Sequence, residues 1–404
     1  MPRWLWNNVK VRNLSYRPVK ILHSCPVWLA PTQTWLYNQI KSLPADIECT
    51  VACIGLSKPE LFPVADLHSF CGTSGLRYKF EALLRKLNIP LYPFWLKQYA
   101  KRSRSTVIHS HFGNMGWFDL LAATQLNLPH VVTFYGLDVD HLPQQDSRWL
   151  TRYAQLFDSV DLVLCEGSHM ASRIVARGCK AEKVRVHHLG VDLKFIPFQP
   201  RAWDPATPLK VLIAGAFREK KGIPCALEVL GRLQDSVCLE ITLIGDADAD
   251  PRSKEEKQNI LAVIDKYGMA DKVRMLGYCT HTKMLEEAYK SHIFFSPSVH
   301  AQDGDSEGGL PVSIIEMAAS GMPVVSTFHC DIPEVIKHGV SGLLAHEHDV
   351  DGLLAQMQSL ILAPEKWIDL SRAARDLIEA EYDVTLQADR LASIYRELRA
   401  TREV

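Results

Sequence analysis

Short apolar runs alternate with longer amphipathic runs along most of the chain. The apolar runs predict strands of parallel sheets, because strands that helices cover on both faces need no polar face. In the first half these runs are residues 19–24, 47–54, 107–112, 130–134, 162–165 and 184–187. In the second half they are residues 209–214, 239–244, 273–276, 293–296 and 324–327. Runs with helical spacing lie between them, so each half predicts an alternation of strand and helix.

The length and one proline-rich segment predict two domains. A chain of 404 residues is too long for one ordinary domain and long enough for two hydrophobic cores. Residues 196–208 contain four prolines and no periodicity, which predicts a linker. We therefore expect an α/β protein with two doubly wound, Rossmann-like domains, residues 1–195 and 209–384, that face each other across a cleft.

Composition and charge exclude several classes of protein. Hydrophobic residues make up 47% of the chain and charged residues 23%, as in ordinary globular proteins. The net charge of −1 argues against a nucleic-acid-binding protein. The ten cysteines form no C-x-x-C pair, which indicates free thiols in a reducing compartment. Without a secretory signal or an apolar run of roughly 18 residues, we expect a cytoplasmic protein, soluble or peripheral on the inner face of the membrane.

One segment departs from the even balance of charge. Residues 76–105 carry eight Lys and Arg but a single acid, Glu81, and six aromatic residues lie among them. Such a mixture suits an anionic membrane surface, where each cation contributes ~1 kcal/mol. The alternative is a solvated helix face whose aromatic side chains fill the core, and RNA binding is a weaker third interpretation.

The most informative stretch is residues 303–327, where an acidic, glycine-rich loop leads into a short helix and then a strand. Pro311 suits the first turn of that helix, because its fixed φ fits and its missing N–H is not needed there. The free backbone N–H groups of residues 309–312 would favour an anion such as a diphosphate. Glu307 precedes the helix and Glu316 lies within it. A carboxylate would not attract an anion, so the two glutamates are better explained as groups that hold sugar hydroxyls.

The run EGGLPVSIIEMAASGMPVVST, which begins at Glu307, resembles the E-x7-E motif of the family 4 retaining glycosyltransferases, especially bacterial exopolysaccharide and lipopolysaccharide enzymes of the colanic-acid type. The spacing to Glu316 is one residue longer here. Either Glu307 reaches the donor from a bulged loop, or Asp305 or Asp303 shares its role. The resemblance implies the GT-B fold, a nucleoside-diphosphate sugar as donor, and no metal or other cofactor. It also implies that the last helix, in residues 385–404, packs back on the N-terminal domain.

The resemblance also implies roles on the donor side. In the family's strand–GR…KG–helix segment the Arg and the Lys hold the donor diphosphate. Lys221 matches that Lys, Ala216 stands at the Arg position, and Arg218 is the expected substitute. Glu307 would hold sugar hydroxyls and stabilise positive charge at the anomeric carbon. The expected catalytic residues are therefore Glu307, Arg218 and Lys221, and the expected donor-binding residues are Glu316 at the ribose, Tyr278 near the base, Gly308, Gly309, Leu310 and Pro311.

Two segments of the N-terminal half resemble the acceptor side of the same family. HSHFG and TFYGLD are similar to the family's HxHFG and TFHGxD, which gives His111, Tyr135 and Asp138 as the expected acceptor-side residues. Tyr135 stands where the family usually has His. A tyrosine hydroxyl can donate and accept a hydrogen bond but is no base near neutral pH. Retaining transfer in this family does not require a protein base.

These residues predict a retaining hexosyltransferase. It would move a sugar from a nucleoside-diphosphate sugar to a hydroxyl of a glycan or a lipid-linked saccharide, in the synthesis of cell-surface polysaccharide. Two alternatives stay open. A nucleotide-sugar 2-epimerase would use the same diphosphate site without an acceptor. A non-catalytic subunit that binds nucleotide sugars would account for the departures at Tyr135 and Ala216.

Overall fold

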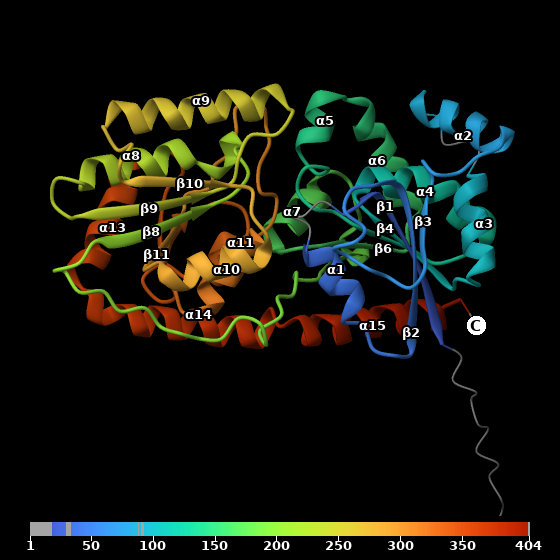
Figure 1. Ribbon diagram of the computed structural model, residues 1–404. Coiled ribbons are helices and arrows are strands. Elements are labelled where there is room, and N and C mark those ends of the chain that lie inside the picture. The colour runs from blue at the N-terminus through green and yellow to red at the C-terminus, as the bar shows by residue number, and fades with distance from the viewer. Residues whose placement is uncertain (1–17, 30–33, 88, 90–92, 403–404) are drawn as a thin grey trace, which may run out of the picture.

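The computed structural model describes residues 18–29, 34–87, 89 and 93–402. Two α/β domains lie side by side, and the two C-terminal helices run along both of them (Figure 1). Each domain is a parallel sheet with helices on its two faces. The doubly wound α/β architecture predicted from the apolar runs is therefore confirmed.

The N-terminal sheet has seven strands in the order β3-β2-β1-β4-β5-β6-β7. Helices α3, α4, α6 and α7 cover one face, and α1 and α15 cover the other. The strands are β1 (Val19–Trp28), β2 (Ile47–Leu56), β3 (Leu67–Ser69), β4 (Val107–His111), β5 (His130–Thr133), β6 (Leu162–Cys165) and β7 (Val184–Val186). The helices are α1 (Thr34–Lys41), α2 (Leu76–Lys86), α3 (Phe94–Arg102), α4 (Gly113–Leu126), α5 (His141–Gln145), α6 (Arg148–Ser159) and α7 (Ser168–Ala176), with a 3-10 turn η1 (Ala181–Lys183).

The C-terminal sheet has six strands in the order β10-β9-β8-β11-β12-β13. Its strands are β8 (Leu209–Ala214), β9 (Leu239–Ile244), β10 (Val273–Gly277), β11 (Ile293–Ser296), β12 (Val324–Thr327) and β13 (Leu343–Ala345). Its helices are α8 (Ile223–Leu233), α9 (Pro251–Lys266), α10 (His281–Lys290), α11 (Val312–Ala319), α12 (Ile332–Val335), α13 (Val350–Leu362) and α14 (Trp367–Glu381), with 3-10 turns η2 (Glu219–Lys221) and η3 (Pro364–Lys366). The final helix is α15 (Val384–Ala400).

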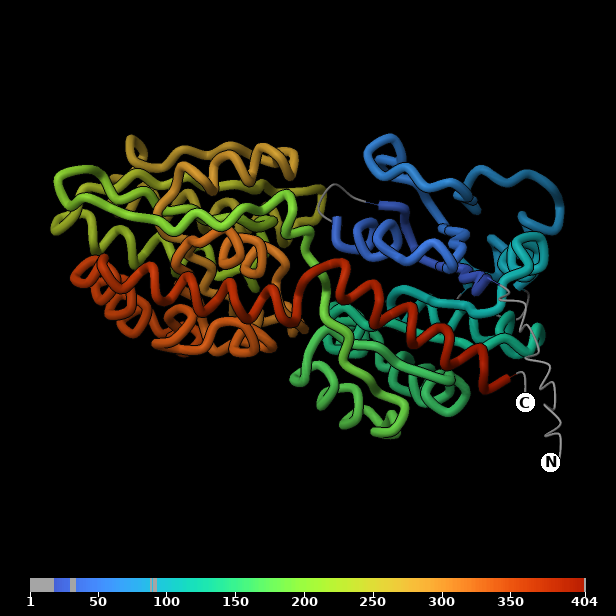
Figure 2. The backbone as a smooth tube through the Cα atoms, turned by 90° about the horizontal axis from the view of Figure 1, so that it is seen from below, coloured from blue at the N-terminus to red at the C-terminus, as the bar shows by residue number. Residues whose placement is uncertain are grey.

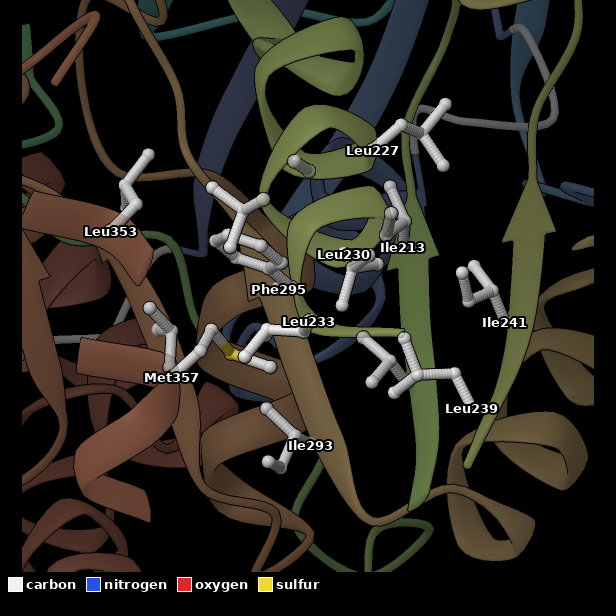
Figure 3. Packing of buried hydrophobic residues seen from close by; sticks show 14 of the residues in the cluster. Ile213, Leu227, Leu230, Leu233, Leu239, Ile241, Ile293, Phe295, Leu353 and Met357 are labelled. Atoms are coloured by element: carbon white, nitrogen blue, oxygen red, sulfur yellow. The ribbon is translucent and has the colours of Figure 1, made fainter. Parts of the chain in front are cut away.

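An apolar core lies between the C-terminal sheet and helices α8, α9 and α13 (Figure 3). Leu227 and Leu230 of α8 pack against Ile213 of β8, and Met357 of α13 closes the layer. Each fully buried side chain of this size contributes about 1.5–3 kcal/mol. The second face carries α10, α11 and α14 over a separate apolar cluster. The core thus holds the carboxyl ends of β8, β11 and β12 in fixed positions.

Helix α15 crosses from the C-terminal to the N-terminal domain (Figure 2). Leu391 and Tyr395 of this helix are buried against Ile21 of β1. The Tyr395 hydroxyl lies 2.6 Å from Nδ1 of His109 in β4. Arg396 binds the Asp46 carboxylate with two nitrogen–oxygen distances of 2.8 and 3.0 Å. The end of the chain is thereby part of the core of the first domain.

Two glycines, Gly113 and Gly116, lie in the first turn of α4, which begins at Gly113. A Cβ at Gly113 would lie 2.2 Å from the Phe134 ring, and one at Gly116 would lie 2.7 Å from Val132. The glycines are there because the first turn of α4 packs directly on the end of β5. Close packing, and not turn formation, explains them.

Candidate active site

A cavity of about 430 Å³ lies between the two domains, within the size range of small-molecule sites. It opens at the carboxyl ends of the central strands, where ligands bind in doubly wound sheets because the strand order reverses there. The N-terminal domain contributes Trp35, Phe112, Tyr135 and Glu166 to its wall. The C-terminal domain contributes Gly215, Ala216, Lys220, Lys221, Tyr278, His281, Glu307, Leu310, Pro311 and Glu316.

A buried ion pair occupies the middle of the cavity wall. Lys221 Nζ lies 2.8 Å from Oε1 of Glu307, and the Ser298 hydroxyl donates to the same carboxylate over 2.8 Å. Lys220 makes a parallel pair with Asp305 over 3.0 Å. Burial acts to raise the pKa of Glu307, but the charges of Lys221 and Lys220 outweigh it and lower the pKa to about 2. Glu307 is therefore an anion at neutral pH and lies beside two cations, Lys220 and Lys221.

Backbone geometry brings the lysine loop to this position. Gly222 follows Lys221 with φ of +60°, and a Cβ there would lie 2.0 Å from the Pro297 carbonyl oxygen. Only glycine combines that dihedral angle with such a close approach. The turn η2 is thus pressed against the end of β11, and Lys221 points towards the loop that carries Glu307.

The start of helix α11 forms the opposite side of the cavity. Pro311 is the N-cap of α11, and Leu310 beside it is buried. The backbone N–H groups of the first turn have no partner within the helix, so this end carries partial positive charge. Gly308 and Gly309 let the loop before the helix pass close to the N-terminal domain: a Cβ on Gly308 would lie 2.0 Å from Cα of Gly136.

Further into α11, Glu316 faces the cavity with a partner of its own. Nε2 of His281 at the start of α10 lies 2.7 Å from Oε1 of Glu316. This hydrogen bond raises the pKa of His281 above its usual value, although burial opposes the shift. Tyr278, also on the cavity wall, is 50% exposed, so its ring is accessible to a ligand.

On the N-terminal side, a hydrogen-bonded series runs inward from the cavity. The Tyr135 hydroxyl lies 2.6 Å from Nδ1 of His111, and Nε2 of His111 lies 3.0 Å from Nδ1 of His23. Burial lowers the pKa of both histidines and raises the pKa of Tyr135 well above its usual range. These groups are therefore uncharged at neutral pH. Asp138 accepts from the backbone N–H groups of Gly113 and Tyr135, over 2.6 and 2.9 Å, and so fixes the Tyr135 loop from below.

Two family models match the two domains in turn. Residues 32–195 match "Glycosyltransferase Family 4", and residues 196–377 match "Glycosyl transferases group 1". The chain is 32% identical over 294 residues to the amylovoran biosynthesis glycosyltransferase AmsK of Erwinia amylovora, which covers 71% of this chain and 69% of that protein. This chain belongs to the glycosyltransferase family. It is also 30% identical to the putative colanic acid biosynthesis glycosyltransferase WcaL of Escherichia coli K12 over 310 residues, 74% of this chain and 73% of that one.

Solved structures agree on the fold of this glycosyltransferase. Anabaena HepE, crystallised with UDP and glucose, superimposes with a TM-score of 0.76 over 94% of this chain and 100% of that one, at 17% identity. Sucrose-phosphate synthase from Thermosynechococcus elongatus gives a TM-score of 0.73 over 95% of this chain and 100% of that one, at 19% identity. At such identities the likeness concerns the arrangement of the two domains alone.

Seven of the expected residues of the glycosyltransferase line the cavity: Lys221, Tyr278, Glu307, Leu310, Pro311, Glu316 and Tyr135. His111 and Asp138 are fully buried and do not line it. Arg218 lies outside the cavity, where its guanidinium binds Asp250 over 2.6 Å and Asp248 over 2.9 Å. Its backbone is extended just before η2, so the side chain reaches towards the start of α9. Lys220, the residue before Lys221, lies on the cavity wall instead. Asp303 is paired with Arg252, and neither residue lines the cavity.

Sequence reasoning missed Glu166, Lys220 and His281, which also line the cavity. Glu166 follows β6 and lies so close to Gly309 that a Cβ there would sit 2.1 Å from its carboxylate. Burial, together with nearby Asp331 and Asp138, raises the pKa of Glu166 well above its usual range. His281 and Lys220 carry no signal beyond their residue type. Only the position of Glu166 at the carboxyl end of a strand could have indicated it.

Proposed function

We propose that this glycosyltransferase is a retaining enzyme. It transfers a sugar from a nucleoside-diphosphate sugar to a hydroxyl of a glycan or lipid-linked saccharide, in the synthesis of a cell-surface polysaccharide. The observation that carries the proposal is the Lys221–Glu307 ion pair, which lies at the start of α11 in a cavity between the domains. AmsK and WcaL, named for amylovoran and colanic acid biosynthesis, support the class of product.

The donor diphosphate would bind Lys221, Lys220 and the first-turn N–H groups of α11. Without donor, Glu307 and Asp305 neutralise the two lysines. A diphosphate that takes over the lysine charges leaves the Glu307 carboxylate beside the sugar, where it can accept from hydroxyls and stabilise positive charge at the anomeric carbon. Lysines suit this exchange, since an ammonium binds as a point charge and can change partner without a fixed planar geometry.

Glu316 would hold the ribose hydroxyls and Tyr278 would lie near the base. The hydrogen bond from His281 fixes the Glu316 carboxylate before the donor arrives, which reduces the entropy lost on binding. Leu310 and Pro311 would form the apolar floor under the ribose. These roles require only groups that already line the cavity.

In the reaction itself the bond between the anomeric carbon and the diphosphate oxygen breaks, and the acceptor oxygen bonds to the same face of that carbon. The acceptor proton passes to the departing phosphate oxygen. Two observations support this route. His111 has a lowered pKa and a partner on each ring nitrogen, and Tyr135 has a raised pKa and keeps its own proton, so neither is suited to take the acceptor proton. Tyr135, on the cavity wall, would hydrogen-bond an acceptor hydroxyl, and His111, buried behind it, would hold the Tyr135 hydroxyl in place.

We also propose that the protein contacts a membrane, and the supporting observation is an exposed apolar face on helix α2. Trp95 of α3 is buried, so part of the aromatic content of residues 76–105 belongs to the core. Leu76, Phe80, Leu83 and Leu87 are nevertheless 86, 51, 54 and 59% exposed, at the spacing of one helix face. The basic residues of the same segment flank this face, and we propose that it contacts an anionic membrane that holds a lipid-linked acceptor. None of the helices in the described part of the chain is long and apolar enough to cross a bilayer.

The decisive experiment determines the anomeric configuration of the product. The purified protein is incubated with UDP-, GDP- and ADP-sugars and a panel of lipid-linked saccharides, and the new linkage is assigned by NMR. Retention of the donor configuration is expected. Inversion would refute the retaining mechanism, and an epimer formed from donor alone would favour the 2-epimerase. Donor binding without transfer or hydrolysis on any acceptor would favour a non-catalytic subunit.

A further inference from the structure

Three neighbouring strands of the C-terminal sheet end in loops that carry metal-ligating side chains. His300 follows β11, His329 and Cys330 follow β12, and Glu347 follows β13. The three strands are adjacent in the sheet, so parallel topology brings their carboxyl ends together. One nitrogen from each histidine and the Cys330 sulfur all lie within 4.8 Å of one another. This group lies outside the residues that line the interdomain cavity.

Glu347 orients both imidazole rings. Its Oε1 lies 2.8 Å from Nδ1 of His329 and 2.9 Å from Nδ1 of His300. Its other oxygen accepts from the His300 backbone N–H over 2.7 Å. With Nδ1–H donated to a carboxylate, each ring keeps its lone pair on Nε2, which is the arrangement of a carboxylate–histidine–zinc series.

Cys330 completes the group, and its backbone is strained. Its φ is +47°, in the left-handed region that glycine adopts freely and other residues do not. Strained residues of this kind cluster at functional sites, because the surroundings must hold them in place. The sulfur lies 3.2 Å from Nε2 of His329. The corresponding separation in a tetrahedral zinc site is roughly 3.5 Å from the usual bond lengths, so a small outward movement admits an ion.

We infer that His300, His329 and Cys330 form a site for a divalent transition ion of the Zn²⁺ type. Imidazole and thiolate ligands together select such ions over Mg²⁺ or Ca²⁺. Glu347 holds the two imidazoles, water takes the fourth position, and the Cys330 thiol releases its proton to solvent as the metal–sulfur bond forms. His329 is fully buried, whereas the His300 side chain is 53% exposed, which leaves an entry path from solvent.

The site is in contact with the loop that carries Glu307. Nε2 of His329 accepts the backbone N–H of Glu307 over 3.1 Å. A metal ion bound at Nε2 removes that acceptor, so the Glu307 main chain must move when the site is filled. The bound ion is therefore an inhibitor of sugar transfer that acts by displacing Glu307, and this part of the inference rests on the function proposed above.

The test titrates Co²⁺ into the metal-free full chain and records its absorption. Thiolate ligation gives an intense near-ultraviolet charge-transfer band, and tetrahedral Co²⁺ gives visible d–d bands. We expect both, with one ion per chain. Cys330→Gly should abolish the charge-transfer band, and because glycine relieves the positive φ this variant is expected to fold. His300→Ala should weaken binding at least roughly tenfold, as loss of metal-site partners does. Cys71→Ser, which changes an exposed cysteine elsewhere, is the matched control.

The spectroscopic result does not depend on the enzymatic activity. A wild-type protein without the charge-transfer band, or a band that survives in Cys330→Gly, would overturn the metal site. Inhibition by Zn²⁺ is measured separately, relative to the metal-free rate of each variant, and is expected in the wild type but not in Cys330→Gly. A ligated ion with no effect on rate would overturn the connection to Glu307 alone.

Discussion

Replacing Lys221 with alanine is expected to slow sugar transfer at least about tenfold, and up to the 10²–10³-fold that one preorganised electrostatic donor contributes. The lower bound applies because Lys220 remains as a second cation on the same wall. The Lys221 side chain is 19% exposed and Glu307 is 6% exposed, so water screens their interaction little. The loss is expected mainly in kcat, because the charge on the diphosphate grows as the sugar leaves.

The same change has a calculable effect on stability. The lowering of the Glu307 pKa from 4.5 to about 2 corresponds to about 3 kcal/mol at roughly 1.4 kcal/mol per pH unit. A carboxylate with a lowered folded-state pKa contributes fully above its unfolded value of 4.5, and the contribution disappears as pH falls through about 2. Lys221→Ala should therefore destabilise the protein near neutral pH, and the difference from wild type should shrink between those two values.

Both effects can be measured on one set of samples. Initial rates with saturating acceptor give kcat and KM, and urea unfolding at a series of pH values gives the free energy of unfolding. Lys254→Ala, an exposed lysine on α9, is the matched control and should change neither quantity. An unchanged kcat in a folded Lys221→Ala protein would refute the role of this ammonium in the reaction. A stability difference that persists unchanged to acid pH would refute its coupling to Glu307.

Three further predictions concern other parts of the molecule. Leu83→Ser on the exposed face of α2 should reduce co-sedimentation of the protein with anionic vesicles. Leu362→Ser is the control, because Leu362 on α13 is also exposed, at 82%, and this variant should sediment like the wild type. An equal loss in both variants would contradict a specific membrane face. Gly308→Ala should lower activity far more than Gly339→Ala. Both glycines have φ of +74°, but only a Cβ at Gly308 would collide with backbone, 2.0 Å from Cα of Gly136. Similar rates in the two variants would show that the contact with the N-terminal domain is dispensable. His281→Ala should raise KM for the donor roughly tenfold, the size expected for one hydrogen bond to a charged group, with kcat nearly unchanged; calorimetric titration of the nucleoside diphosphate checks it, and equal affinity would sink the role of Glu316.

Local sequence was enough to predict which loops form the site. Lys221, Glu307 and Glu316 all follow or begin elements whose apolar patterns are strong, and parallel topology sends those ends to one edge of the sheet. Arg218 was not predictable in the same way. Its direction depends on Asp248 and Asp250, which belong to a different loop and draw the guanidinium away from the cavity.

The amino-acid sequence alone was sufficient to predict the two-domain α/β architecture and the helix that begins after Pro311, because continuous apolar runs, prolines and glycines act on their own neighbours. The packing of distant elements, which the sequence does not reveal, sets which charged side chains meet. It paired Lys221 with Glu307, placed Glu166 against Gly309, and gathered the His300, His329 and Cys330 group around Glu347. A polar side chain takes its direction from the partner that compensates its loss of water, and that partner is set by the packing of distant elements.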